Sequence, residues 1–246
     1  MIFGNNTASD ISKLSKIPQA AKRRVVFGKF WNITIILFII EAEKCSVMHR
    51  RPDKIPPWFL KEYAHEIGPI LTLIYEASID SGVVPSRWKY ANVCRVFKGG
   101  QKSNPCNCRP ISLTCIACKV LEHSVHSYVM KHLDFHQILT DVQHRFRAKQ
   151  STVTQLIITI HDLAKTIQDN KSIHAAILNF SKAFDKVPHL RPLCKLEFYG
   201  IRENSLKWFE SFLIGHSQSV IWDGSLSQNP IMVTSGVPQG TVLGPL

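Results

Sequence analysis

The sequence predicts an α+β fold. Three stretches have apolar residues at helical spacing: 58–78, 115–133 and 151–168. Shorter apolar runs with strand character lie between and after them: 91–97, 175–178 and 217–234. With 246 residues and a hydrophobic content of 45%, the chain can bury one large core or two smaller ones.

The first predicted elements are a helix and a hairpin. The helical pattern of 58–78 ends before Gly82 and Pro85, which stop helices. A turn then leads into a strand at 91–97. The polar loop 99–107 separates this strand from a second apolar segment, 108–114.

The second half of the chain continues with helices and a hairpin. The helix at 115–133 is followed by one that Ser151 caps and that runs through Gln168. The second of these helices has one apolar face: Leu156, Ile160, Leu163 and Ile167. Further helices are predicted at 190–200 and 205–213. A hairpin with a Gly-Ser turn is predicted from 217–224 and 228–234.

The charge balance indicates a polyanionic partner. The chain has 30 Lys and Arg residues and 18 Asp and Glu residues, which gives a net charge of +12 and a pI near 9.5. Nucleic acid is the first partner that such a charge favours, and an anionic membrane surface is the second.

Cysteine usage favours a reducing compartment. The count of seven is odd, and no clean secretory signal is found, so free thiols and a nuclear or cytoplasmic location are expected. Four cysteines fall close together: Cys106, Cys108, Cys115 and Cys118. Their spacing matches no common zinc pattern, and the apolar residues between them favour a core. Two histidine pairs are interpreted as solvated helix faces: His123 with His126, and His132 with His136.

Residues 1–50 differ in character from the rest, and their role is unknown. An apolar run at 31–40 follows a basic stretch, but ten residues cannot cross a bilayer as a helix. A buried strand, or sequence foreign to the fold, is the interpretation of this run.

Two long motifs carry the functional argument. Residues 175–189 read Ala-Ala-Ile-Leu-Asn-Phe-Ser-Lys-Ala-Phe-Asp-Lys-Val-Pro-His. Residues 234–246 read Thr-Ser-Gly-Val-Pro-Gln-Gly-Thr-Val-Leu-Gly-Pro-Leu. In this order they resemble motifs A and B of the reverse transcriptases of non-LTR (LINE-type, jockey-like) retrotransposons. That family reads Leu-Asp-Phe-Ser-Lys-Ala-Phe-Asp and then Ser-Gly-Val-Pro-Gln-Gly-Ser-Val-Leu-Gly-Pro.

Four further segments carry the same resemblance: 51–57, 84–98, 108–114 and 140–152. The resemblance thus covers about four fifths of the chain, from residue 51 to the end. Arg145 stands where the family usually has glycine, and we expect strain there if the backbone needs a positive φ.

The resemblance implies a right-hand polymerase fold with fingers and a partial palm. Residues 51–170 would form a fingers-like region and residues 171–246 the partial palm. A strand at 175–180 would then lie in the palm sheet beside the hairpin of 217–234. Asn179 and Gln239 would share one cleft.

The resemblance also assigns roles to single residues. Lys98 and Arg109, across a hairpin, would contact the triphosphate of an incoming deoxynucleotide. Phe184 would be the aromatic steric gate against a ribose 2′-OH. Two motif B residues, Gln239 and Gly240, would pack against the template–nucleotide pair. Three basic residues would face an RNA template or RNA–DNA duplex: Arg145, Arg147 and Lys149.

Catalysis in this family implies two Mg²⁺ ions held by carboxylates. The family's motif A aspartate is Asn179 here, and an amide is a neutral ligand. The other two carboxylates belong to a later Ala-Asp-Asp hairpin, and the chain is interpreted as truncated before it. Asp185 has no metal role in the resemblance. No metal site is expected to be intact, and the chain as written is expected to be inactive.

Three hypotheses follow. The first is an inactive fragment of a reverse transcriptase domain. The second is a basic nucleic-acid-binding remnant that grips template–primer duplex without chemistry. The third is the product of a degenerate reading frame that folds poorly because a sheet edge stays exposed.

Overall fold

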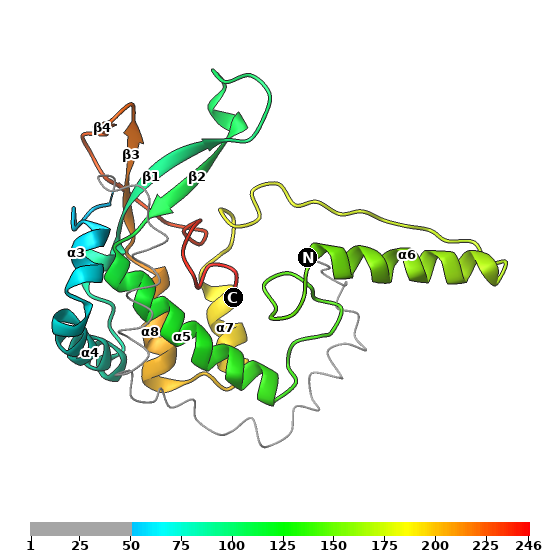
Figure 1. Ribbon diagram of the computed structural model, residues 1–246, viewed down its shortest axis with the longest axis horizontal. Helices are drawn as coiled ribbons and strands as arrows, with labels where there is room; N and C mark the ends of the chain where they lie inside the picture. The colour runs from blue at the N-terminus through cyan, green and yellow to red at the C-terminus, as the bar shows by residue number, and fades with distance from the viewer. Residues whose placement is uncertain (1–50) are drawn as a thin grey trace.

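The computed structural model describes residues 51–246, and the predictions made for residues 1–50 lie outside the described residues (Figure 1). Six helices are present in this part of the chain: α3 (Pro57–Glu62), α4 (Ala64–Ser81), α5 (Ile116–Phe135), α6 (Thr152–Gln168), α7 (Leu190–Phe198) and α8 (Glu203–Leu213). Five strands accompany them: β1 (Tyr90–Phe97), β2 (Cys108–Leu113), β3 (Ser217–Trp222), β4 (Ser225–Leu226) and β5 (Ile231–Met232). The predicted α+β class is confirmed.

The predicted first helix is divided into α3 and α4 at Tyr63, whose φ of −100° and ψ of 26° break the helical geometry. Gly82 ends α4 as predicted, in the left-handed region with φ 69°. A side chain at this position would come within 2.8 Å of Cβ of Lys207 on α8. The glycine therefore serves both the turn and the packing of α4 against α8.

The sheet has the strand order β2-β1-β3-β4, with β5 paired to β3 as well. Strand β1 runs antiparallel to β2 and parallel to β3. A two-residue turn joins β3 to β4, and both of its residues, Asp223 and Gly224, have positive φ (47° and 79°). Such a turn suits the twist of a hairpin. It lies one residue earlier than the Gly-Ser turn that the sequence predicted.

The strand predicted at 175–180 is wrong. Residues 171–180 form no ladder, and Ile177 is 94% exposed. The physical reason is that β3 has no free edge for another strand, because β1 occupies one side and β4 with β5 the other. An apolar run shows the tendency to form a strand but does not show whether a partner edge is available.

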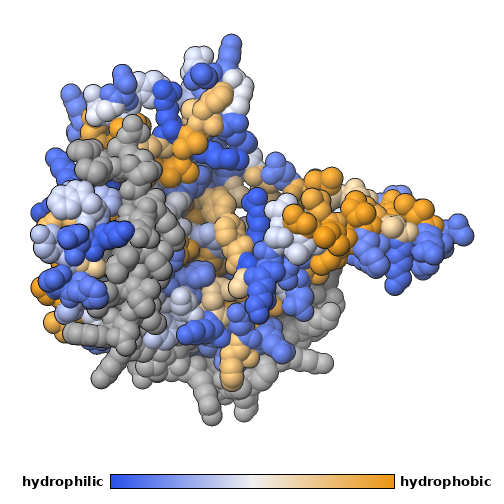
Figure 2. All heavy atoms as spheres, viewed as in Figure 1, coloured by the Kyte–Doolittle hydropathy of each residue, from blue (hydrophilic) through white to orange (hydrophobic). Residues whose placement is uncertain are grey.

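Helix α6 begins as predicted but buries nothing. The Ser151 hydroxyl accepts from the backbone N of Thr154 at 3.1 Å, and the Thr154 hydroxyl accepts from the backbone N of Ser151 at 3.0 Å. Its apolar residues remain exposed, for example Leu156 at 57% and Ile160 at 61%. The helix projects from the body of the molecule in Figure 1, and Figure 2 shows apolar residues along it. No helix in 51–246 is long and apolar enough to span a membrane.

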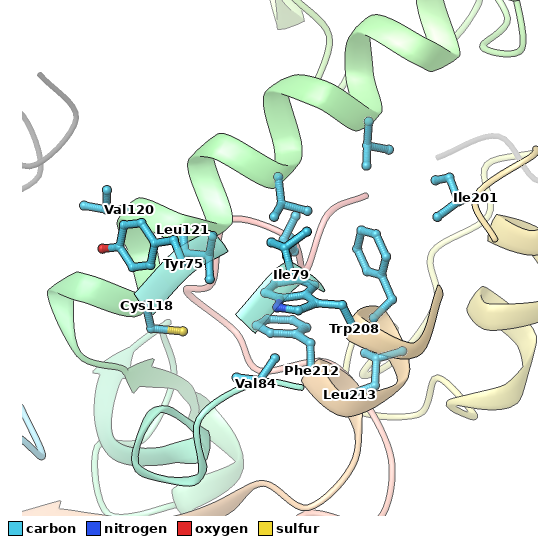
Figure 3. Close-up of a cluster of buried hydrophobic side chains, with 14 of the residues drawn as sticks. Tyr75, Ile79, Val84, Cys118, Val120, Leu121, Ile201, Trp208, Phe212 and Leu213 are labelled. Carbon is cyan, nitrogen blue, oxygen red and sulfur yellow. The ribbon is translucent and has the colours of Figure 1, made fainter. Parts of the chain in front are cut away.

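The core lies where α4, α5 and α8 meet (Figure 3), and in Figure 1 the sheet is drawn above these helices. Trp208 and Phe212 of α8 stack with ring centroids 5.6 Å apart and an interplanar angle of 11°. The indole N–H of Trp208 donates to the Ser78 hydroxyl at 3.0 Å, so the one polar atom of this buried ring has a partner. Leu243 belongs to this core and Val237 packs against it, so the core supports residues 235–243, which follow the last strand.

Candidate functional site

Motif B, residues 234–246, contacts strand β2. The backbone N of Ser112 donates to the carbonyl of Gln239 at 2.7 Å. Gly240 has φ 102°, and a Cβ there would stand 3.1 Å from the Ser112 carbonyl oxygen and 3.2 Å from Cγ2 of Ile111. The backbone thus approaches β2 at a distance that leaves little space for a side chain.

Two predicted cationic residues lie on the same hairpin. Arg109 is paired with Val96 across β1 and β2, and the backbone N of Lys98 donates to the carbonyl of Asn107 at 2.8 Å just beyond the strand. Because side chains alternate along a strand, Arg109 shares a face of β2 with Ile111, the residue that Gly240 approaches. The hairpin thus brings Arg109 to the face where motif B packs, with Lys98 exposed near its end.

The turn at 181–187, from motif A, forms the second side of the site. The backbone N of Val237 donates to the carbonyl of Phe184, and that of Gly236 to the carbonyl of Val187, both at 2.9 Å. Phe184 is half-buried at this contact. Motifs A and B, some fifty residues apart in the sequence, are therefore joined by backbone hydrogen bonds.

Asp185 has a role that the sequence did not indicate. Its Oδ1 accepts from Nε2 of Gln239 at 2.8 Å, and its backbone carbonyl accepts from the Ser235 hydroxyl at 3.3 Å. The carboxylate thus fixes the direction of the Gln239 side chain. No sequence signal distinguishes this contact, since it joins two residues 54 positions apart.

Gly236 permits the contact between the two motifs. Its φ is 83°, and a Cβ there would come within 2.7 to 2.8 Å of three backbone atoms of Asp185. Backbone atoms cannot move aside as a flexible side chain can. A residue with a side chain at 236 would therefore push motifs A and B apart.

The expectation that Asn179 shares a cleft with Gln239 is not met. Asn179 is exposed, in the extended segment that forms no strand, and no hydrogen bond connects it to 235–243. The structure brings Phe184 and Asp185 to motif B instead. The reason is the missing sheet pairing of 175–180, which would have directed Asn179 into the interior.

The three basic residues of 140–150 differ in their availability. Arg147 is paired with Asp134 at 3.7 Å between Nη2 and Oδ1, whereas Arg145 and Lys149 are exposed. Arg145 does not adopt a positive φ, whereas Phe146 and Lys149 in the same loop do, with φ 58° and 62°. The loop lies beside motif B, because Gln143 and Phe146 line a small cavity together with Pro245 and Leu246.

The residues present do not fit a pair of Mg²⁺ ions. Within 51–246, no three His, Cys, Asp or Glu side chains come together as a metal site. Asn179 offers an exposed amide, and Asp185 is engaged by Gln239. The four clustered cysteines are separated by the fold: Cys106 is exposed and Cys108 half-buried, whereas Cys115 and Cys118 lie in the core.

Glu122 is a buried acid that no sequence motif singled out. Its side chain is fully buried on α5, and Oε2 accepts from the backbone N of Val242 at 2.6 Å and of Leu243 at 3.3 Å. The Cys118 thiol donates to Oε1 at 3.6 Å. Burial raises the pKa of Glu122, and the two backbone N–H groups partly oppose this shift. Helical spacing could have indicated the burial, since Glu122 lies four residues after Cys118 and three before Val125, both core residues.

Comparison with known proteins identifies the class. Residues 100–246 match the family described as reverse transcriptase (RNA-dependent DNA polymerase), and this match covers more than half of the chain. The chain therefore belongs to the reverse transcriptase family. Its α+β architecture is compatible with part of a right-hand polymerase fold, as predicted.

Relatives narrow the class to non-LTR transposons. The chain is 28% identical over 218 residues to the probable RNA-directed DNA polymerase from transposon BS of Drosophila melanogaster, a match that covers 85% of this chain and 23% of the relative. It is 29% identical over 177 residues to the RNA-directed DNA polymerase from mobile element jockey of the same species, a match that covers 71% and 19%. The chain thus spans about a fifth of the length of these relatives, and the predicted jockey-like resemblance is confirmed.

The first prediction concerns the close approach of Gly236. Gly236→Ala should lower the free energy of unfolding by about 1–3 kcal/mol more than Gly224→Ala, because it adds a clash with Asp185 to the cost of a left-handed backbone. Gly224 is the matched control, since it has φ 79° and a Cβ added there would meet no atom within 4 Å. Urea unfolding followed by circular dichroism measures both. Equal losses would show that motifs A and B are not in contact here.

The second prediction concerns pH. Because the folded-state pKa of Glu122 is raised, its contribution to stability is present below the unfolded pKa and is lost as the pH rises through the folded value. Glu122→Gln keeps an acceptor oxygen but cannot ionise. Its stability relative to the unmodified chain should therefore increase between pH 4 and pH 7.5. Urea unfolding at a series of pH values tests this, and parallel pH profiles for the two proteins would contradict it.

Proposed function

We propose that this chain is a nucleotide- and template-binding portion of a retrotransposon reverse transcriptase, without polymerase activity of its own. The observation that carries the proposal is the contact of motif B with two other parts of the chain. Gln239 is held by Ser112 through its backbone and by Asp185 through its side chain. These contacts support the proposal because they hold Gln239 in a defined position.

The nucleotide-binding side of the proposed site would consist of the β1–β2 hairpin and the motif A turn at 181–187. Lys98 and Arg109 would bind the triphosphate, because a guanidinium and an ammonium group make charge-assisted hydrogen bonds to phosphate oxygens. Phe184 would select a deoxynucleotide by crowding a 2′-OH. Its half-buried position beside Val237 supports this role.

The template side is the loop 140–150. Arg145 and Lys149 are exposed and would contact phosphates of an RNA template or RNA–DNA duplex. The contribution of Arg147 would be smaller, because Asp134 already neutralises part of its charge. Residues 51–170 and 171–246 would be the fingers and the partial palm, and the protein would act in the nucleus or cytoplasm.

The absence of activity is argued from the ligand set. Members of the family generally use Mg²⁺, which needs anionic oxygen ligands that converge. Asn179 supplies a neutral amide on an exposed segment, and these 246 residues contain no Ala-Asp-Asp sequence. Removal of one well-placed electrostatic group already costs on the order of 10² to 10³ in rate.

A second candidate is a nucleic-acid-binding remnant with no nucleotide site. The net charge of +12 favours it, because duplex binding needs basic residues but no metal. The two proposals differ in whether deoxynucleotides bind. A complementary deoxynucleotide should tighten binding to a template–primer duplex only if the nucleotide site exists.

The third prediction is salt-sensitive binding of RNA–DNA duplex with little sequence preference. Arg145→Gln and Lys149→Gln should each weaken binding and lower the slope of log K against log salt by roughly 0.7–0.9, the value for one phosphate contact. Arg147→Gln should change the slope less. Fluorescence anisotropy with labelled duplex, titrated at several salt concentrations, measures these slopes.

Lys207→Gln is the matched control, because Lys207 is exposed on α8, next to Gly82 at the end of α4. Its slope should equal that of the unmodified chain. Equal losses for Lys207→Gln and Lys149→Gln would show that only net charge matters and would contradict the assigned template surface. Affinity that does not change with salt would contradict duplex binding altogether.

The fourth prediction is that the chain shows no template-directed DNA synthesis. Asn179→Asp alone should not restore it, because one carboxylate cannot hold two Mg²⁺ ions. Asn179→Asp combined with a C-terminal extension that carries the family's Ala-Asp-Asp hairpin is the variant expected to gain synthesis. Primer extension on an RNA template compares the three proteins. Extension by the unmodified chain would refute the inactive assignment, and Asp185→Asn would then show whether Asp185 supplies a ligand.

A further inference from the structure

We infer that Glu122 is a positioning residue for the nucleic-acid-facing turn at Gln239 and Gly240. This inference rests on the proposed function, since it concerns how the same site is held. Glu122 has no hydrogen bond to either residue. Its carboxylate binds the backbone N–H groups of Val242 and Leu243, which follow the turn directly.

The turn is short enough for this contact to determine its place. The carbonyl of Pro238 accepts from the Thr241 hydroxyl at 2.8 Å and from the Thr241 backbone N at 3.3 Å, which closes residues 238–241 into one unit. Within this unit, the backbone N of Ser112 donates to the carbonyl of Gln239. Directly after it, Glu122 binds Val242. The turn is therefore fixed on two sides, once by the sheet and once by α5.

Packing of the core does not explain why a glutamate occupies position 122. A fully buried carboxylate that has no salt bridge within residues 51–246 costs stability, and an apolar residue would better suit the buried Val125, which lies one helical turn further along α5. An apolar residue could not accept the hydrogen bonds of the two backbone N–H groups that point to one Glu122 oxygen. Glu122 therefore fixes the orientation of the backbone at residues 242–243 and does not improve the packing of the core.

The side chain of Leu243 gives a second attachment, because it is 7% exposed and belongs to the core. A buried side chain fixes where the chain passes but leaves rotation about the backbone free. The hydrogen bonds to Glu122 remove that rotation. We therefore expect loss of the carboxylate to loosen the turn without unfolding the core.

The experiment compares Glu122→Met and Glu122→Gln in the full chain. Glutamine keeps an acceptor for the two N–H groups, whereas methionine has a similar length and offers none. Hydrogen exchange of residues 239–243 is measured without nucleic acid, and affinity for RNA–DNA duplex is measured by anisotropy. Glu122→Met should raise exchange in this segment and weaken duplex binding by about tenfold each, and Glu122→Gln should restore both.

Ile79→Ala is the control for general loss of stability, because Ile79 is a core residue of α4 next to Trp208 (Figure 3). It should destabilise the fold without a selective rise in exchange at 239–243. Unchanged exchange at 239–243 in Glu122→Met, failure of Glu122→Gln to restore it, or an affinity loss no larger than in Ile79→Ala would each overturn the inference.

The two measurements also separate this inference from the proposed function. If the unmodified chain binds no duplex, the proposed function is refuted and the role of Glu122 in binding with it. Exchange at 239–243 would still report whether Glu122 holds the turn. If duplex binds but Glu122→Met binds equally well, only the inference fails.

Discussion

The hydrogen bond from the backbone N of Ser112 to the carbonyl of Gln239 joins strand β2 to motif B, and the arrangement of the candidate site depends on this contact. Gly240 favours it, because a Cβ there would stand only 3.1 Å from the Ser112 carbonyl oxygen. Gly236 plays the same part toward the motif A turn. Two glycines four residues apart therefore let one segment touch a strand on one side and a loop on the other. These two glycines of motif B are explained by distances within this fold.

Some basic residues of this molecule are engaged in contacts within the protein, whereas others are exposed. The excess of basic residues gives a net charge of +12, yet Arg147 is paired with Asp134, and Arg95 lies 3.4 Å above the ring of Trp222. Such residues contribute to the overall field but are already engaged locally. Counting basic residues in a sequence therefore overstates the number of phosphates that a surface can neutralise.

Local signals in the sequence predicted the elements well, and contacts between distant segments poorly. The capping box at Ser151 and the stop at Gly82 depend on neighbouring residues, so these helix ends were predictable within three residues. The position of 175–180 depends on whether a strand edge is free, and Glu122 and Asp185 act on residues 54 or more positions away. No local pattern contains that information.

The parallel pairing of β1 with β3 has a consequence for the order in which the protein folds. Tyr90 pairs with Ser217, so the centre of the sheet closes a loop of more than a hundred residues. The β1–β2 hairpin can form early, but it must wait for the ribosome to deliver β3, roughly ten seconds later at ordinary synthesis rates. During that interval one edge of β1 has no partner. Pairings between distant segments are also slow to form. The time between synthesis of β1 and of β3 is thus the period in which the nascent chain is most open to pairing with the wrong strand.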